Sequence, residues 1–237
     1  MIPVIRVRGL HYTYENGAQA LHGVDFDLLE GESVALLGAN GSGKTTFVLH
    51  LNGLLNGQGS IEIAGMPITP DNLPAIRRKV GMVFQDADEQ LFMPTLLEDV
   101  AYGPANLGFP PEEAVHKAIH ALESVGLSGL ERRAPYQLSA GEKRRAAIAG
   151  VLAMEPEILI LDEPTTYLDP PAQRELIQLL SQLPQAKVIV THDASFALAT
   201  ARRAVFFRNG TIGGTGPVDE ILTRFDWTLQ PRSGAAR

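Results

Sequence analysis

A glycine-rich segment of the chain has the residue types that bind a polyphosphate. It follows the apolar run Ala35-Leu36-Leu37 and consists of Gly38, Ala39, Asn40, Gly41, Ser42, Gly43, Lys44 and Thr45, with Thr46 next. A strand, a turn and a helix in this order would point backbone N–H groups at phosphate oxygens. Lys44 would reach the β- and γ-phosphates, and the Thr45 hydroxyl would bind Mg²⁺. The alternative is an ordinary glycine turn, but the pattern arises by chance in only about one chain of this length in a hundred.

Two later apolar runs end in polar residues that could complete a hydrolytic centre. Ile158–Leu161 is followed by Asp162 and Glu163, and Lys187–Thr191 is followed by His192. The carboxyl ends of parallel strands meet at one edge of a sheet, where ligands bind. Successive side chains alternate in direction, so we expect Asp162 to hold Mg²⁺ and Glu163 to face the attacking water. His192 would contact the γ-phosphate and the water; solvated strand-end acids and a plain loop histidine are the alternatives.

The order of these patterns predicts an α/β fold. Alternating strand-like segments fill residues 2–37, and helical spacing appears at Glu112–Val125 and Gly141–Met154. Short apolar runs then alternate with helices, which is typical of a buried, mostly parallel sheet. Arg208-Asn209-Gly210-Thr211 predicts a tight hairpin. We therefore expect an antiparallel β part at the N-terminus and an inserted helical subdomain at about 88–154.

Composition limits the possible functions. The chain has 237 residues, 45% of them hydrophobic, which suffices for one sizeable domain with an insert. Its formal net charge of −7 does not favour nucleic acid, and zero cysteines exclude disulfides and thiol chemistry. No apolar run reaches the roughly 18–20 residues that span a bilayer. We expect a soluble chain whose work at a membrane would need a membrane-spanning partner.

The segment Leu138-Ser139-Ala140-Gly141-Glu142 resembles the signature motif of ATP-binding subunits of ABC transporters. The resemblance covers residues 4 to about 222 and implies a P-loop NTPase core. It implies a single ATPase domain over 1–237, with core residues 1–87 and 155–237. In this family the signature helix faces the ATP held by a second chain, so Ser139, Gly141 and Glu142 would bind the partner's nucleotide. Locally, Ser139 and Glu142 also form the pattern of a helix-capping box.

This resemblance extends to further positions and to three departures. Tyr14 stands where the family stacks an aromatic ring on adenine, and Gln85 stands where a glutamine contacts Mg²⁺ and links the site to the membrane partner. Ala140 replaces a second glycine, Glu142 a common glutamine, and Tyr167 a small residue at the crossing between subunits. The first two departures would lower affinity or slow closure.

The stretch Val83–Phe92, together with Glu98–Pro104, resembles energy-coupling factor importers, including the cobalt and nickel branch. The resemblance implies an ATP- and Mg²⁺-dependent ATPase that drives uptake of a metal ion or vitamin. Its partners would be a second ATPase chain, a transmembrane coupling subunit and a substrate-binding membrane subunit. It would lie at the cytoplasmic face of the membrane and bind no nucleic acid.

Two other functions stay open. The first is a non-transport ABC ATPase that switches conformation on DNA or ribosomes; such proteins typically carry tandem domains, coiled coils or zinc modules. The second is a GTPase, although no Asn-Lys-x-Asp segment for reading guanine occurs.

Several conspicuous residues receive plainer interpretations. His116 and His120 are spaced for a metal on one helix, with Glu112 and Glu113 nearby, but we interpret them as part of a solvated helix face. The pairs Arg132-Arg133 and Arg144-Arg145 are interpreted as surface charges. The one tryptophan, Trp227, receives no role.

Overall fold

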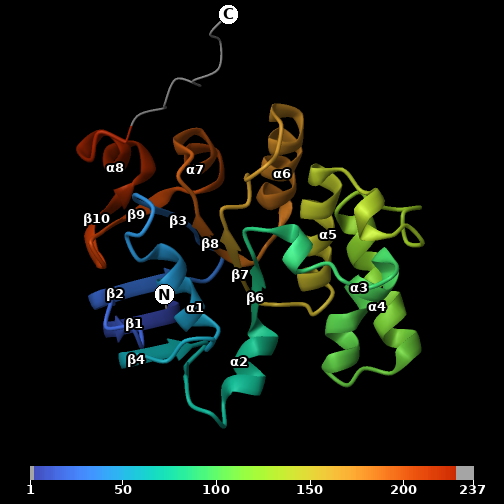
Figure 1. Ribbon diagram of the computed structural model, residues 1–237, viewed down its shortest axis with the longest axis horizontal. Helices are drawn as coiled ribbons and strands as arrows, with labels where there is room; N and C mark the ends of the chain where they lie inside the picture. Colours follow the sequence, from blue (N-terminus) through green and yellow to red (C-terminus); the bar gives the residue numbers. More distant parts are fainter. Residues whose placement is uncertain (1–2, 228–237) are drawn as a thin grey trace, which may run out of the picture.

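The computed structural model describes residues 3–227, which form two β-sheets with helices packed around the larger sheet (Figure 1). The smaller sheet is antiparallel, with the order β2-β1-β4-β5. Its strands are β1 (Pro3–Thr13), β2 (Gln19–Leu29), β4 (Gln58–Ile63) and β5 (Met66–Pro67). This confirms the antiparallel N-terminal part that the alternating pattern predicts.

The larger sheet has the order β10-β9-β3-β8-β7-β6, and all its neighbouring pairs are parallel except β9 and β10. Its strands are β3 (Ser33–Leu37), β6 (Val80–Val83), β7 (Ile158–Asp162), β8 (Ala186–Val190), β9 (Arg203–Arg208) and β10 (Thr211–Pro217). Every residue of β7 and β8 is buried, as expected for strands covered on both faces. The predicted α/β fold is therefore confirmed, and the carboxyl ends of β3, β7 and β8 lie at one edge.

Between β9 and β10 the chain makes the predicted hairpin. Asn209 and Gly210 have φ angles of 49° and 72°, and Thr211 pairs with Arg208. Positive φ at both central residues is the geometry that Asn-Gly favours in two-residue hairpins.

Eight α-helices and two 3₁₀ helices occur in the described part of the chain. They are α1 (Lys44–Leu51), α2 (Leu73–Lys79), η1 (Ala87–Glu89), α3 (Leu96–Asn106), α4 (Pro111–Ser124), η2 (Pro135–Gln137), α5 (Ala140–Leu152), α6 (Pro170–Gln182), α7 (Ala194–Thr200) and α8 (Val218–Arg224). The pattern gave no indication of α2, α3 or α8, since two of them span seven residues and α3 contains Pro104. Within residues 3–227 no helix is both long and apolar enough to cross a bilayer.

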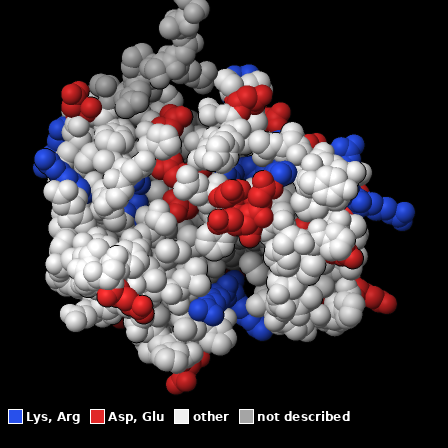
Figure 2. Space-filling model, viewed as in Figure 1, with Lys and Arg blue, Asp and Glu red and all other residues white. Residues whose placement is uncertain are grey.

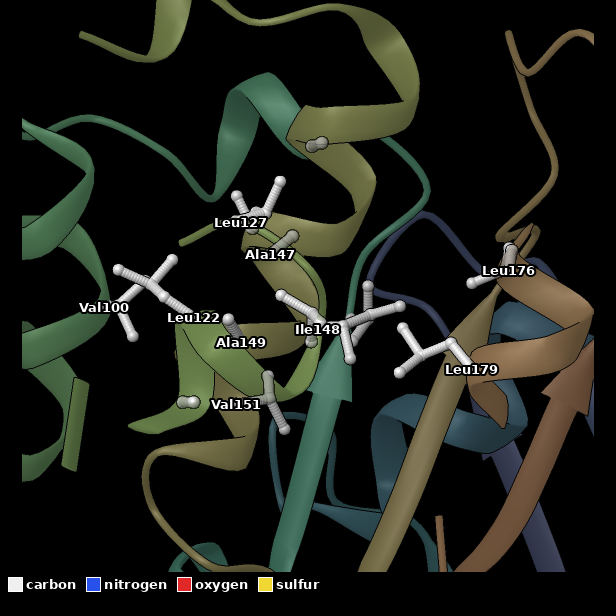
Figure 3. Close-up of a cluster of buried hydrophobic side chains, with 14 of the residues drawn as sticks. Val100, Leu122, Leu127, Ala147, Ile148, Ala149, Val151, Leu176 and Leu179 are labelled. Atoms are coloured by element: carbon white, nitrogen blue, oxygen red, sulfur yellow. The ribbon is translucent and has the colours of Figure 1, made fainter. Parts of the chain in front are cut away.

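Helix α5 joins the helical part to the larger sheet through one hydrophobic core. Figure 3 shows Ile148 of α5 between Val100 and Leu122 on one side and Leu176 and Leu179 on the other. All five side chains are buried, and each contributes about 1.5–3 kcal/mol of transfer free energy. The core holds the start of α5 at a fixed place relative to β6 and β7. The boundaries of the helical subdomain at 88 and 154 stay a prediction.

Candidate functional site

The loop between β3 and α1 is shaped by glycines at positions that admit no side chain. Gly38 has a φ of 139°, and a Cβ there would lie 2.3 Å from the Phe207 carbonyl oxygen. Gly43 has a φ of 106°, and a Cβ there would lie 2.9 Å from the Ala20 carbonyl oxygen. Both backbones are in the region that L side chains rarely adopt, so the loop requires glycine at these two positions.

The start of α1 is open to an anion. Its N-cap residue is Gly43, and no side chain caps it, whereas Ser139 caps α5 and Asp169 caps α6 with side-chain oxygens. The first N–H groups of a helix have no partner within the helix, and the helix dipole places partial positive charge there. The N-terminus of α1 therefore retains the donors that a phosphate group accepts from.

The hairpin between β9 and β10 packs against the phosphate loop. The Gly210 amide donates to the Ser42 carbonyl at 3.0 Å, and the His22 amide donates to the Gly210 carbonyl at 2.9 Å. A Cβ on Gly210 would lie 2.6 Å from the Ala20 carbonyl oxygen. The turn is thus wedged between the phosphate loop and β2, which fixes the loop's shape.

Lys44 and Asp162 lie buried beneath the loop. The Lys44 ammonium donates to the carbonyls of Gly38 at 2.8 Å and Ala39 at 3.1 Å. Burial lowers the pKa of Lys44, and the carboxylates of Glu163 and Asp162 oppose that shift. Burial raises the pKa of Asp162, while a hydrogen bond from the Thr45 side chain and the charge of Lys44 oppose it. The two groups therefore lie near enough to stabilise each other's charge.

Glu163 is held in an unusual backbone conformation beside His192. Its φ is 45°, in the left-handed region, and its amide donates to the Val190 carbonyl at 2.9 Å. The His192 Nδ1 lies 2.7 Å from Glu163 Oε2, within hydrogen-bond distance. Left-handed residues other than glycine cost free energy and concentrate at functional sites. Glu163 is buried, whereas the His192 side chain is 63% exposed. The contact therefore connects the exposed imidazole to a side chain that the protein interior holds in place.

A cavity of about 1300 Å³ opens above these groups. It is larger than the 300–1,000 Å³ typical of small-ligand pockets. Predicted site residues that line it are Tyr14, Gly38, Ala39, Asn40, Gly41, Gly43, Lys44, Thr45, Thr46, Gln85, Glu163 and His192. The Tyr14 hydroxyl lies 2.9 Å from Thr46 Oγ1, which brings the ring predicted for adenine to the start of α1. Tyr12 packs edge-on against Tyr14 and lines a separate, smaller pocket.

Gln85 reaches the cavity from the end of β6, and α5 holds it in place. The Arg144 guanidinium donates to the carbonyls of Phe84 and Gln85, both at 2.6 Å, and its residue is only 3% exposed. Gln90 adds a bond from its side-chain amide to the Ala147 carbonyl at 3.1 Å. The interpretation of Arg144 as a surface charge is therefore wrong. Arg144 faces the end of β6, where two backbone carbonyls accept hydrogen bonds from its terminal nitrogens.

Five predicted residues do not line the cavity: Ser42, Asp162, Ser139, Gly141 and Glu142. Ser42 and Asp162 are buried in the loop and at the end of β7, whereas the other three lie at the start of α5. The capping box is confirmed: the Glu142 carboxylate accepts from the Ser139 amide and hydroxyl, both at 2.7 Å. The hydrogen bond from the Ser139 amide lowers the pKa of Glu142. Ala140 is exposed at the first position of α5, and Tyr167 is 81% exposed with a φ of 65°.

His116 and His120 lie on α4, as predicted. Across residues 3–227 no group of three or more histidine, aspartate or glutamate side chains is arranged to hold a metal ion.

Sequence patterns missed several residues of the cavity wall, above all Asp226 and Trp227 from the C-terminal segment. Gln173, Asp193 and Ser195 also line it. Asp193 and Ser195 lie one and three residues after His192, so their position follows from the strand end that the pattern predicts. Trp227 has no motif around it, and only its being the single tryptophan of the chain could have drawn attention.

The comparisons with known proteins agree with this geometry. The family model described as ABC transporter matches residues 21–166. A curated protein of Geobacter sulfurreducens described as an ABC transporter ATP-binding protein is 48% identical over 92% of this chain and 88% of its own length. The energy-coupling factor transporter ATP-binding protein EcfA of Methanothermobacter thermautotrophicus is 46% identical over 92% of this chain and 72% of its own.

Two solved structures share the fold. CbiO1 of Clostridium perfringens, described as part of the ABC transporter complex CbiONQ, has a TM-score of 0.86 and 34% identity, covering 95% of this chain and 93% of its own. The ATP-binding cassette MJ0796, solved as a dimer in a post-hydrolysis state with ADP and phosphate, has a TM-score of 0.80 and 30% identity. That alignment covers 90% of this chain and 98% of MJ0796.

Proposed function

Because this chain belongs to the ABC transporter family and is an ATP-binding, ATP-hydrolysing subunit, we propose that it closes with a second ATPase chain on two ATP molecules. The observation that supports this proposal most directly is that the predicted site residues fall into two groups, one in the cavity and one at the start of α5. Lys44, Glu163 and His192 line one cavity, whereas the capped start of α5 at Ser139 lies outside it. Each ATP would then be held by the phosphate loop of one chain and the α5 N-terminus of the other.

In this proposal each polar group at the sheet edge has a separate role. Lys44 and the open N-terminus of α1 bind the phosphates, and Tyr14 stacks on the adenine. Glu163 polarises the attacking water, and His192, oriented by its bond to Glu163, contacts the γ-phosphate. Ser139, Gly141 and Glu142 form the start of α5 that would face the partner's ATP. The Ser139 hydroxyl accepts from the Glu142 amide, so the donors proposed for the ATP are the preceding amides of α5, supported by the helix dipole.

The surroundings of Asp162 fit a magnesium ion. Its Oδ1 atom is buried without a hydrogen-bond partner among the described residues, and oxygen ligands suit Mg²⁺. Asp162, Thr45 and Gln85 are the residues that would hold the ion. When bound, it would neutralise charge on the β- and γ-phosphate oxygens.

The segment after β6 is proposed to transmit closure to a membrane subunit. Figure 2 shows acidic side chains gathered on one face over this segment, where Asp88 and Glu89 are exposed. Phe92 is 62% exposed, which leaves an apolar side chain available to a partner. Lys143 of α5 forms an ion pair with Asp88 at 2.6 Å, and this pair is the proposed link between the start of α5 and the exposed segment.

We further propose an importer of the energy-coupling factor type, with the chain at the cytoplasmic face of the membrane beside coupling and substrate-binding membrane subunits. The similarity to EcfA and CbiO1 supports this assignment. The cargo would be a metal ion such as cobalt or nickel, or a vitamin. Identification of the membrane proteins that copurify after detergent extraction tests the importer. Ribosomes or DNA in their place would support the conformational switch instead.

The test of the hydrolytic site is Glu163→Gln. This change keeps size and hydrogen bonding but removes the base, so we expect ATP binding by calorimetry to persist and phosphate release to fall at least about a hundredfold. Glu157→Gln is the matched control, because Glu157 stands at the opposite end of β7 in an exposed ion pair with Lys79. Turnover of the Glu163 variant at the rate of the control would remove Glu163 from the catalytic role.

A further inference from the structure

The chain after α8 returns to the predicted hydrolytic site. At Asp226 the backbone turns with a φ of 49°, and the Trp227 amide donates to the Leu222 carbonyl at 2.8 Å. Asp226 and Trp227 both contribute to the wall of the nucleotide cavity. A segment with no recognisable motif thereby lies next to the residues proposed for chemistry.

An aromatic stack fixes the position of the indole ring. Phe225 lies flat on Phe206, with ring centroids 4.0 Å apart and planes 2° from parallel. Trp227 meets Phe206 edge-on at 5.4 Å. Phe206 belongs to β9, which pairs with β3 just before the phosphate loop. Aromatic contacts of these two geometries are favourable, so the ring is anchored to the sheet rather than to the loops.

The indole N–H of Trp227 bonds to His192. Nε1 donates to the His192 carbonyl oxygen at 3.2 Å. Two further contacts join His192 to Glu163: Nδ1 lies 2.7 Å from Glu163 Oε2, and the His192 amide lies 3.4 Å from the same oxygen. Since the imidazole is mostly exposed, its orientation depends on these few bonds to backbone and Glu163.

We infer that Trp227 is a positioning residue for His192, which holds the histidine backbone so that the imidazole stays between Glu163 and the γ-phosphate. The inference rests on the proposed role of His192 in hydrolysis. It assigns the indole N–H, rather than the bulk of the ring, as the group that matters for turnover. In this inference the segment that contains Trp227 contributes to ATP hydrolysis by positioning His192.

The discriminating variant is Trp227→Phe, which keeps an aromatic ring against Phe206 and removes the N–H. Loss of one hydrogen bond predicts a kcat about three- to tenfold lower, with KM for ATP within about twofold of wild type. The melting temperature should stay within about 2 °C, because the apolar contact remains. Trp227→Ala should show the same fall in kcat and in addition a lower melting temperature.

A second measurement does not depend on turnover. Trp227 is the one tryptophan of the chain, so the tryptophan emission of the whole protein reports this position alone. We expect that emission to change when MgATP is added to Glu163→Gln, which binds without hydrolysing. An emission spectrum unaffected by saturating MgATP contradicts contact between this segment and the occupied site.

His192→Ala distinguishes failure of the proposed role of His192 from failure of the positioning role of Trp227. With turnover lost in His192→Ala and reduced in Trp227→Phe, the inference stands. With turnover lost in His192→Ala but equal to wild type in Trp227→Phe, the positioning role is refuted and the proposed site is retained. With turnover unchanged in His192→Ala, the proposed role of His192 fails, and the inference fails with it. A fall in melting temperature with unchanged kcat in Trp227→Phe would assign the ring a purely structural role.

Discussion

The contact between α5 and the end of β6 depends on one buried guanidinium, and replacing it gives a sharp test. Arg144→Met keeps the aliphatic stem and removes the donors to the Phe84 and Gln85 carbonyls. Hydrogen bonds from a charged donor contribute about 1.5–3 kcal/mol each. Burying the guanidinium has a cost, which also lowers the pKa of Arg144, so the two bonds do not count in full.

The net effect expected for Arg144→Met is a loss of about 2–4 kcal/mol in the free energy of unfolding. For a chain of this size that corresponds to a fall of about 5–15 °C in melting temperature. Turnover should fall too, because Gln85 loses the anchor that holds it at the cavity. Arg144→Lys keeps the charge but cannot reach both carbonyls in a fork, so it should recover only part of the loss.

The neighbouring arginine supplies the control. Arg145 pairs with Glu175, whose side chain is 57% exposed, so Arg145→Met should cost only about 0–1 kcal/mol. Urea unfolding followed by circular dichroism gives both free energies under the same conditions. Equal losses for the two variants would refute the assignment of Arg144 as the link between α5 and Gln85.

Two further predictions concern the nucleotide and the response to pH. Tyr14→Ala should raise KM for ATP about tenfold by removing a stacking surface, whereas Tyr14→Phe, which loses only the bond to Thr46, should stay within about threefold in a steady-state assay. Burial raises the pKa of Asp99, so its contribution to stability is full below the ordinary aspartate value and is lost as pH rises through the raised value. Asp99→Asn should therefore gain stability relative to wild type as pH rises above the ordinary aspartate value of about 4, measured by thermal unfolding; a pH-independent difference would contradict this.

Sequence patterns predict the parts of the site that local chemistry determines. Asp162, Glu163 and His192 follow apolar runs, and buried parallel strands bring their ends to one edge whatever the details of packing. The glycines of the phosphate loop are predictable from local conformation: Gly38 and Gly43 have φ angles of 139° and 106°, which L side chains rarely adopt whatever packs against the loop.

Other parts depend on packing between distant segments, which no local pattern records. Arg144 carries the residue type of a surface position and becomes buried only because β6 ends opposite it. Trp227 reaches His192 through a turn at Asp226 and a stack on Phe206, none of which is visible in its neighbourhood in the sequence. No sequence pattern predicts the long-range bond of Trp227, and the prediction for Arg144 was wrong.

The wedged turn at Gly210 has a consequence for the newly synthesised chain. The phosphate loop ends at residue 45, yet its shape depends on Phe207 and on the Gly210 amide, more than 160 residues later. Long-range closure is slow, and synthesis proceeds from the N-terminus at about 5–20 residues per second. A ribosome-bound chain that ends before β9 has the sequence of the phosphate loop but lacks both of these contacts. We therefore expect ATP binding by a nascent chain only after the hairpin between β9 and β10 has left the ribosome.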